Sequence, residues 1–359
     1  MNKKEILCTL GPASMNDRVI TRLADVGVNL FRINLSHTKL EDLEERIRYI
    51  QDRSSVPICL DTEGAQVRTG DFLTKEIVVK EGDIVEIPLV PILGEGKKFN
   101  LYPRNIVLEL KVGDLVSIDF NSVLVQVIDV NDSGAKARVV TGGLLGQNKA
   151  VTVDRDIDMS PLTNKDKESI KVGLSMGIKH FALSFANKEE DVDFIRSLTG
   201  QDTFIISKIE TIRGIRNLKG IATKSDALLI DRGDLSRQVP IEKIPRAQKE
   251  IIQAGKQNNV KVYVATNLLE SMIKSPLPTR AEVNDVFNTL DDGADGLVLA
   301  AETAIGAHPI HSAVMISRVM KQYIRSSQTN VSVVDDKSES SMWLVEPHGG
   351  QLINRLAED

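Results

Sequence analysis

The feature that most constrains the fold is a regular alternation of short apolar runs with amphipathic helical patterns. The runs are rich in Val, Ile and Leu, which is typical of parallel strands buried on both faces. Eight of them occupy residues 5–10, 30–35, 56–60, 180–185, 203–209, 227–230, 262–266 and 296–300, and helical patterns lie at 16–26, 39–52, 188–198, 243–258, 282–292 and 310–324. Eight such units predict an α/β protein with a closed (β/α)8 TIM barrel, a fold that typically needs about 250 residues. An open doubly wound sheet is the alternative.

Residues 71–155 break this alternation and predict an inserted all-β domain. Four segments here alternate or run apolar between Gly-Asp and Asn-Asp turns: "EIVVKEGDIVEIPL", "GDLVSIDF", "VLVQVIDV" and "KARVVTGG". We therefore expect residues 1–70 and 156–325 to form the barrel, 71–155 a β-barrel-like lid domain, and 326–359 a polar linker and a tail that could begin a further domain. Helices are expected to restart at two capping boxes, Thr163 with Asp166 and Thr279 with Glu282.

Composition narrows the class of protein. The 359 residues carry a net charge of −5 with dispersed Lys and Arg, which argues against a nucleic-acid partner. The two cysteines, Cys8 and Cys59, lie inside apolar runs, so we expect free thiols in a reducing compartment. The N-terminus does not resemble a signal peptide and no run could span a bilayer, so a cytoplasmic location without a membrane partner is expected.

Polar side chains gather at the carboxyl ends of the expected strands, where parallel barrels place their active sites. Arg32, Asn34 and Ser36 are spaced two apart, so on a strand they project to one face and need polar partners. A polar-filled barrel interior is the simpler explanation for such a set.

A second group follows the fifth and sixth expected strands. Lys208 and Glu210 share a face, where a buried lysine beside a carboxylate could stabilise an oxyanion or could be a structural ion pair. Asp231 and Asp234 follow the next strand, and Gly233 allows close backbone approach. Glu210 and Asp234, from adjacent strands, suit Mg²⁺, which prefers one or two protein carboxylates. Further polar residues at strand ends are Thr266, Glu302 and Thr303.

Seven segments carry a resemblance to the pyruvate kinase family. In chain order they are "CTLGPAS", "FRINLSH", "DTEGAQVRTG", "ISKIE", "DRGDL", "ATNLLESMIKSPLPTRAE" and "DGADGLVLAAETAIG", and they span roughly residues 3–325. The resemblance implies a barrel interrupted after its third strand by a β-rich lid. It also implies phosphoryl transfer from phosphoenolpyruvate to ADP, giving pyruvate and ATP, with Mg²⁺ (or Mn²⁺) and K⁺ as cofactors.

The resemblance also assigns roles to residues. Lys208 would stabilise the enolate of pyruvate, and Arg32 would clamp the transferring phosphoryl group. The Gly233 amide, Asp234 and Thr266 would bind the substrate, with Thr266 close to the proton delivered to the enolate carbon. The remaining assignments are Glu210 and Asp234 for Mg²⁺, Asn34, Ser36, Asp61 and Thr62 for K⁺, and Arg32, His37, Arg68 and Lys149 for the nucleotide phosphates.

The sequence departs from the family pattern at several positions. The departures are Glu63 for a usual lysine, Gln66 for an acid or, in some members, a lysine, Ala300 and Ala301 for Ser-Gly, Asp231 for alanine, Gln238 for an acid, and "DFN" at 119–121 for Asp-Asp-Gly. Lysine to glutamate at residue 63 changes the local charge by two units, which weakens anion binding if the side chain faces the site. Binding of phosphoenolpyruvate or pyruvate is therefore expected more firmly than use of ADP as acceptor.

Two features concern partners. The chain carries no counterpart of the family's C-terminal domain, which holds an effector site and a subunit interface, so the usual tetramer and allosteric control are not expected, and a homo-oligomer stays open. The tail "EPHGGQLINRL" resembles the first residues of sulfate adenylyltransferases. It implies a fused or partner sulfate-activating domain, whose ADP the kinase could recycle.

Three interpretations follow. The leading one is a short, active pyruvate kinase-like phosphotransferase. The second is a barrel that keeps metal-assisted enolpyruvate chemistry with another acceptor. The third is a degenerate, non-catalytic module attached to a sulfate-activating enzyme, against which the retained Lys208, Glu210 and Asp234 argue.

Overall fold

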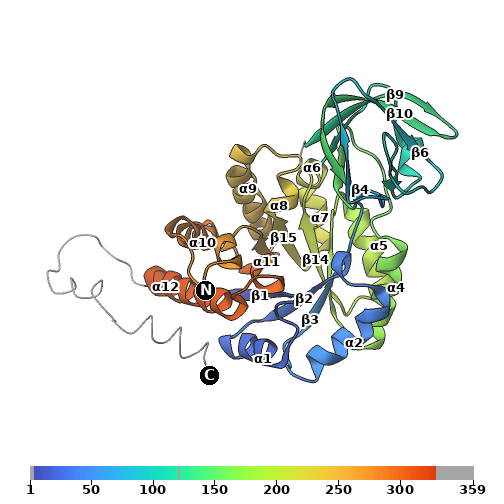
Figure 1. The fold of residues 1–359 in the computed structure, drawn as a ribbon. Helices are drawn as coiled ribbons and strands as arrows, with labels where there is room; N and C mark the ends of the chain where they lie inside the picture. The colour runs from blue at the N-terminus through green and yellow to red at the C-terminus, as the bar shows by residue number, and fades with distance from the viewer. Residues whose placement is uncertain (1–3, 120–121, 329–359) are drawn as a thin grey trace. The chain divides into compact units, whose positions relative to one another are not determined.

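The apolar runs form eight parallel strands that close into a barrel (Figure 1). The computed structural model describes residues 4–119 and 122–328. In order around the barrel, the strands are β1 (Glu5–Leu10), β17 (Gly296–Leu299), β16 (Lys261–Ala265), β15 (Ala227–Asp231), β14 (Phe204–Ile209), β13 (His180–Leu183), β3 (Ile58–Asp61) and β2 (Leu30–Asn34). The closed ring confirms the predicted (β/α)8 barrel and excludes the open sheet.

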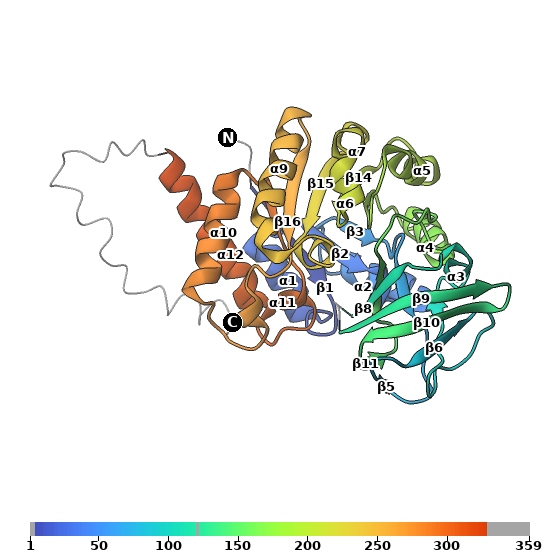
Figure 2. The same cartoon turned by 90° about the horizontal axis from the view of Figure 1, so that it is seen from above.

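Helices cover the outside of this barrel. They are α1 (Asp17–Val26), α2 (Leu40–Gln51), α4 (Asn164–Ser175), α5 (Glu189–Thr199), α6 (Ile212–Arg216), α7 (Leu218–Lys224), α8 (Arg232–Leu235), α9 (Ile244–Gln257), α10 (Arg280–Asp292), α11 (Ala301–Ala304) and α12 (Pro309–Gln328), with short 3₁₀ turns η1 (Leu35–His37), η2 (Ile241–Lys243) and η3 (Glu270–Ile273). In Figure 2, α9 lies along β15 and β16, which it contacts. Both predicted capping boxes, at Thr163 and Thr279, are present.

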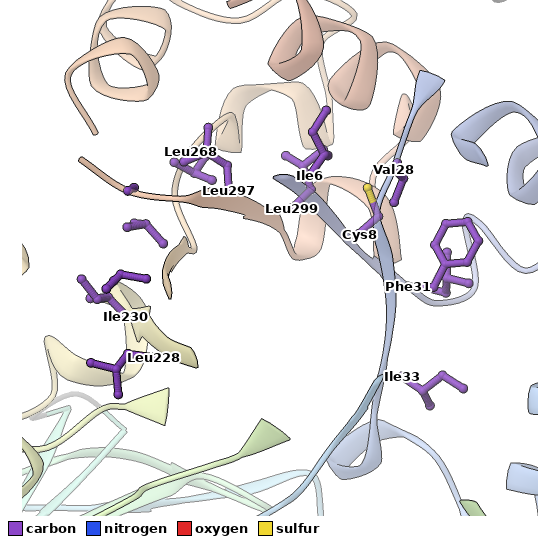
Figure 3. Close-up of a cluster of buried hydrophobic side chains, with 14 of the residues drawn as sticks. Ile6, Cys8, Val28, Phe31, Ile33, Leu228, Ile230, Leu268, Leu297 and Leu299 are labelled. Atoms are coloured by element: carbon purple, nitrogen blue, oxygen red, sulfur yellow. The ribbon is translucent and has the colours of Figure 1, made fainter. Parts of the chain in front are cut away.

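The strands present two different faces. Every second side chain, among them Ile6, Cys8, Phe31 and Leu228, packs between the strands and the helices (Figure 3). The residues between them point into the barrel, and on several strands those toward the carboxyl end are polar, as with Arg32 on β2, Asp61 on β3 and Lys208 on β14. On β2 the buried Leu30 is followed two residues later by the buried Arg32. Polar side chains therefore collect at the carboxyl end of the barrel interior.

A second compact unit, Gly64–Ser160, interrupts the barrel unit, which comprises Met1–Glu63 and Pro161–Asp359. It extends beyond the segment 71–155 expected from the sequence at both ends. A seven-stranded sheet has the order β6 (Ile84–Pro88), β10 (Gly134–Thr141), β9 (Val123–Asn131), β8 (Leu115–Ile118), β12 (Ala150–Val153), β4 (Val67–Thr69) and β7 (Leu101–Tyr102). A two-stranded sheet pairs β11 (Gly143–Gly146) with β5 (Glu76–Val79), and α3 spans Ile106–Glu109. The unit has its own apolar core, as an inserted domain requires.

Both cysteines are fully covered and unpaired. Cys8 lies between strand and helices and Cys59 inside the barrel, and burial raises the pKa of each thiol. Because the thiolate is the reactive form, a thiol reagent such as DTNB should modify neither cysteine in the native protein and both after denaturation. Rapid modification of the native protein would contradict this packing.

Among residues 4–119 and 122–328, no helix combines the length and the apolar character that a membrane span requires.

Candidate active site

Lys208 lies at the centre of the polar end of the barrel interior. It is inward-facing on β14 and is 5% exposed. Its Nζ donates a hydrogen bond to Ser184 Oγ at 3.0 Å. It also lies 2.9 Å from Glu210 Oε1, 3.4 Å from Asp61 Oδ1 and 3.8 Å from Asp231 Oδ2. Residues from four neighbouring strands or their ends therefore surround one ammonium group.

The electrostatics of this centre favour a charged lysine. Burial by itself lowers the pKa of Lys208, but the carboxylates of Asp61, Glu210 and Asp231 outweigh burial, and the pKa is raised. The pKa of Glu210 is raised to about 8, because burial and the charges of Asp234 and Asp231 oppose ionisation more than Lys208 favours it. The carboxylates of Glu210, Asp231 and Asp234 therefore repel one another, and a bound cation would reduce this repulsion.

Three carboxylates form a cluster that fits a divalent cation. One oxygen each from Glu210, Asp231 and Asp234 lies within 4.8 Å of the others. Glu210 Oε2 accepts a hydrogen bond from the Phe185 amide at 2.6 Å. Its Oε1 is buried and makes no hydrogen bond of regular geometry. A set of carboxylate oxygens with one such buried acceptor suits a hard ion such as Mg²⁺ or Mn²⁺.

Arg32 is a second buried cation beside this centre. It lies on β2 and is 4% exposed. Its Nε donates to Thr9 Oγ1 at 2.9 Å, and its Nη1 lies 3.2 Å from Asp61 Oδ2. Asp61 thus lies between the two cations Arg32 and Lys208, and it holds them at one end of the barrel interior.

Thr266 closes the site after β16. It has φ 69° and Asn267 has φ 53°, both in the left-handed region, so the chain turns sharply here. The Gly233 amide donates to Thr266 Oγ1 at 2.8 Å. That hydroxyl lies 2.6 Å from the Ala265 carbonyl oxygen and 3.2 Å from Asp231 Oδ1. The turn therefore brings Thr266, Gly233 and Asp231 together.

The helix α8 positions the acids that follow β15. Asp231 caps this helix through its side chain, which accepts from the Asp234 amide at 3.4 Å. Arg237 forms an ion pair with Asp234 Oδ1. Arg232 donates to the Thr266 carbonyl oxygen at 2.8 Å and pairs with Asp285 at 2.9 Å, so α8 is fastened to the turn at Thr266.

The residues expected around K⁺ lie at the ends of β2 and β3. Asn34 and Asp61 are register partners on these adjacent strands. Asn34 Oδ1 accepts a hydrogen bond from the Ser36 amide at 2.9 Å. Thr62 Oγ1 accepts one from the Ser184 amide at 3.0 Å. The structure thus places Asn34, Asp61 and Ser36 near one another, and their role with a cation stays a prediction.

Glu63 faces a lysine of its own unit. Its carboxylate lies 2.8 Å from Lys165 Nζ and accepts a hydrogen bond from Thr163 Oγ1 at 3.2 Å. Lys165 also donates to the Leu35 carbonyl oxygen at 2.6 Å. The Glu63 amide donates to Asp166 Oδ1 at 2.7 Å. The negative charge of Glu63 is therefore balanced locally, where the chain leaves β3.

The residues expected near the nucleotide have partners within their own units. In the second unit, Arg68 donates to Gln66 Oε1 at 2.9 Å and to the Asn148 carbonyl oxygen at 3.0 Å. Lys149 pairs with Asp119 at 2.8 Å. In the barrel unit, His37 ends η1 and is exposed. Contact of these residues with a nucleotide stays a prediction.

Glu302 and Thr303 fix the backbone after β17. Glu302 is 2% exposed, and its oxygens accept from the Leu269 amide at 3.1 Å and the Ala300 amide at 2.9 Å. Thr303 Oγ1 donates to the Thr9 carbonyl oxygen at 2.8 Å. These two polar residues therefore hold loops in place. The tail motif at 346–356 and two residues of "DFN", 120–121, lie outside the described residues.

Sequence reasoning missed three residues that complete this site. Ser184 follows β13 and contacts Lys208, Arg237 pairs with Asp234, and Lys165 pairs with Glu63. Ser184 could have been found, because it is a polar residue directly after an apolar strand, like the other candidates. Nothing in their local sequence distinguishes Lys165 and Arg237 from surface cations.

Comparisons with known proteins identify the family. Residues 1–313 match the family model described as pyruvate kinase, barrel domain. The chain belongs to the pyruvate kinase family. It is 36% identical to the pyruvate kinase of Thermotoga maritima over 96% of this chain and 77% of that protein, and 33% identical to that of Clostridium perfringens over 90% and 70%. A crystal structure of a pyruvate kinase from Cryptosporidium parvum superposes with a TM-score of 0.81 at 32% identity, over 90% of this chain and 69% of that one. These comparisons confirm the resemblance seen in the sequence motifs.

Proposed function

We propose that this protein transfers a phosphoryl group from phosphoenolpyruvate to ADP and releases pyruvate and ATP. One observation carries the proposal: the charged, buried Lys208 lies within 4 Å of Glu210, Asp61 and Asp231 and beside a cluster of carboxylates that fits a divalent cation. Family membership adds support, because the proteins that match over most of this chain are named pyruvate kinases.

The two buried cations suit the charges that such a reaction develops. Phosphoryl transfer depends on positioning and on positive charge rather than on covalent help from the protein. In this proposal Lys208 donates to the oxygen of the departing enolate, and Arg32 clamps the phosphoryl group. Glu210 and Asp234 would hold Mg²⁺ or Mn²⁺, which supplies further positive charge at the phosphoryl oxygens.

The turn after β16 would bind the rest of the substrate. The Gly233 amide, Asp234 and the Thr266 hydroxyl would bind phosphoenolpyruvate, the amide and hydroxyl through its carboxylate. The bond between phosphorus and the enol oxygen breaks as a bond to an ADP oxygen forms. The enolate carbon then takes up one proton, supplied in the end by solvent water, and the Thr266 hydroxyl would lie close to the path of that proton. The hydrogen bonds from the Gly233 amide and to the Ala265 carbonyl oxygen orient the Thr266 hydroxyl.

The remaining sequence assignments complete the proposal. Asn34, Ser36, Asp61 and the Thr62 carbonyl would bind K⁺. His37, Arg68 and Lys149 would contact the nucleotide phosphates, together with Arg32. The balanced charge of Glu63 favours this proposal, because an acid paired with Lys165 repels nucleotide phosphates less than an unpaired one.

The experiment is an assay of the purified protein for pyruvate formation from phosphoenolpyruvate and ADP, with Mg²⁺, in the presence and absence of K⁺. We expect Mg²⁺-dependent turnover that is lost on adding EDTA. No turnover, together with Mg²⁺-dependent exchange of the pyruvate methyl protons with solvent, would replace the proposal with enolpyruvate chemistry toward another acceptor. Absence of both signals would replace it with a non-catalytic module.

A further inference from the structure

We infer that Asp231 is a third protein ligand for the divalent cation, and that this site therefore binds the cation before any substrate is present. The inference rests on the proposed function for the roles of Glu210 and Asp234. Asp231 itself is the residue that stands where the family resemblance leads us to expect alanine, so it adds a carboxylate to the site.

The geometry places Asp231 with the other two acids. It is the last residue of β15, is 6% exposed, and its side chain enters the polar end of the barrel interior. One of its oxygens lies within 4.8 Å of an oxygen of Glu210 and of Asp234. Oxygens bound to one octahedral Mg²⁺ at about 2.1 Å lie roughly 3–4 Å apart. The three carboxylates are therefore at nearly the spacing that a shared ion requires.

Glu210 keeps acceptor capacity for a cation. Its Oε2 accepts from the Phe185 amide at 2.6 Å, and its buried Oε1 meets only the Lys208 ammonium group, at 2.9 Å and without regular hydrogen-bond geometry. A carboxylate oxygen offers about two acceptor sites, so Oε1 could contact an ion between Glu210, Asp231 and Asp234 as well as Lys208.

The net charge around the three carboxylates favours binding of a cation before binding of an anionic substrate. When the three carboxylates are ionised, they carry three negative charges, and the cations paired with them, Lys208 and Arg237, carry two positive charges. This balance would be neutral without Asp231. The extra negative charge attracts a divalent cation and repels an anionic substrate until the cation is bound. Asp231 thus links substrate binding to prior binding of the metal.

A simpler role for Asp231 is to cap the helix α8. Its side chain accepts from the Asp234 amide at 3.4 Å and lies 3.2 Å from Thr266 Oγ1. Asparagine caps a helix as well as aspartate does, because both offer a side-chain oxygen. Capping therefore survives the change Asp231→Asn, whereas the charge for the metal is lost.

The test measures binding of Mn²⁺ alone, from the decrease of its free EPR signal, to the intact chain without substrate. We expect wild type to bind one Mn²⁺ and Asp231→Asn to bind it at least about 10- to 100-fold more weakly, because that loss is already typical when a group that only hydrogen-bonds to a metal ligand is removed. The melting temperature without metal should stay unchanged. The matched control is Asp285→Asn, which removes an acid that pairs with Arg232 of the same α8 segment; it should bind Mn²⁺ like wild type.

The outcomes separate this inference from the proposed function. Wild-type affinity for Mn²⁺ in Asp231→Asn would overturn the inference, and Asp231 would then be a helix cap. Equal weakening in Asp285→Asn would also overturn it, because the effect would not be specific to the cluster. If Asp231→Asn weakens Mn²⁺ binding but the wild type forms no pyruvate, the inference stands and the proposed function fails.

Discussion

Replacing Lys208 with methionine is expected to lower the rate of pyruvate formation by about 10²- to 10³-fold, the cost of removing one preorganised donor to a developing oxyanion. Methionine keeps most of the length of the side chain and removes its charge. The fold should persist, because Glu210 already has a raised pKa and can take up a proton when the ammonium group is absent. Steady-state kinetics at saturating phosphoenolpyruvate and ADP, together with circular dichroism, would measure both effects.

The control for this change is Lys261→Met. Lys261 begins β16 at the amino end of the barrel, where its Nζ lies 2.6 Å from Glu5 Oε1. It also lies in a barrel strand and forms an ion pair, but at the opposite end from the candidate site. The control should turn over within about twofold of wild type. A Lys208→Met enzyme with near-normal turnover would show that Lys208 is a structural cation.

Replacing Glu63 with lysine is expected to lower the free energy of unfolding by about 0.5–3 kcal/mol, the size of interaction energies between residues in one salt-bridge network. The new ammonium group would face Lys165 and would lose the hydrogen bond from Thr163 Oγ1. Both charges are largely covered, with side-chain exposures of 19% for Glu63 and 30% for Lys165, so solvent screens their repulsion only partly. Urea unfolding would measure the change.

Exchanging the two charges tests whether Glu63 and Lys165 stabilise the fold through their direct interaction. Lys165→Glu alone should also destabilise, and the double variant Glu63→Lys/Lys165→Glu should recover part of the loss. Recovery is partial because a glutamate at residue 165 cannot donate to the Leu35 carbonyl oxygen as Lys165 does. If the decreases in the free energy of unfolding of the two single variants simply add in the double variant, the ion pair contributes nothing to stability. Glu63 then acts through other contacts.

The barrel could be predicted from the sequence because its signals are local. A run such as "TFIISKI" identifies a buried strand from its own composition, and it forms β14 as expected. Within a strand, spacing also predicts partners, since Lys208 and Glu210 are two residues apart and lie 2.9 Å apart at the site. Local pattern therefore sufficed for the elements and for pairs on a single strand.

Contacts between residues that are far apart in the sequence could not be predicted in the same way. Ser184 is 24 residues from Lys208 and 123 from Asp61, yet it contacts both. Lys165 is 102 residues from Glu63, on the far side of the inserted unit. These pairs depend on the register of neighbouring strands and on where the chain returns after the insertion. From the sequence alone, Glu63 is expected to weaken anion binding if its side chain faces the site, whereas the structure supplies Lys165 as a partner for its charge.

The contacts of Glu63 bear on whether the inserted second unit can be replaced. The second unit begins at Gly64 and ends at Ser160. Within the barrel unit, the Glu63 amide donates a hydrogen bond to Asp166, and the Glu63 carboxylate accepts hydrogen bonds from Lys165 and Thr163. The chain therefore leaves the barrel unit and returns to it at neighbouring points, as is typical of sites that tolerate an inserted domain. Because these contacts lie within the barrel unit itself, they do not depend on residues 64–160, and a short turn in place of that segment would leave all their partners in the chain.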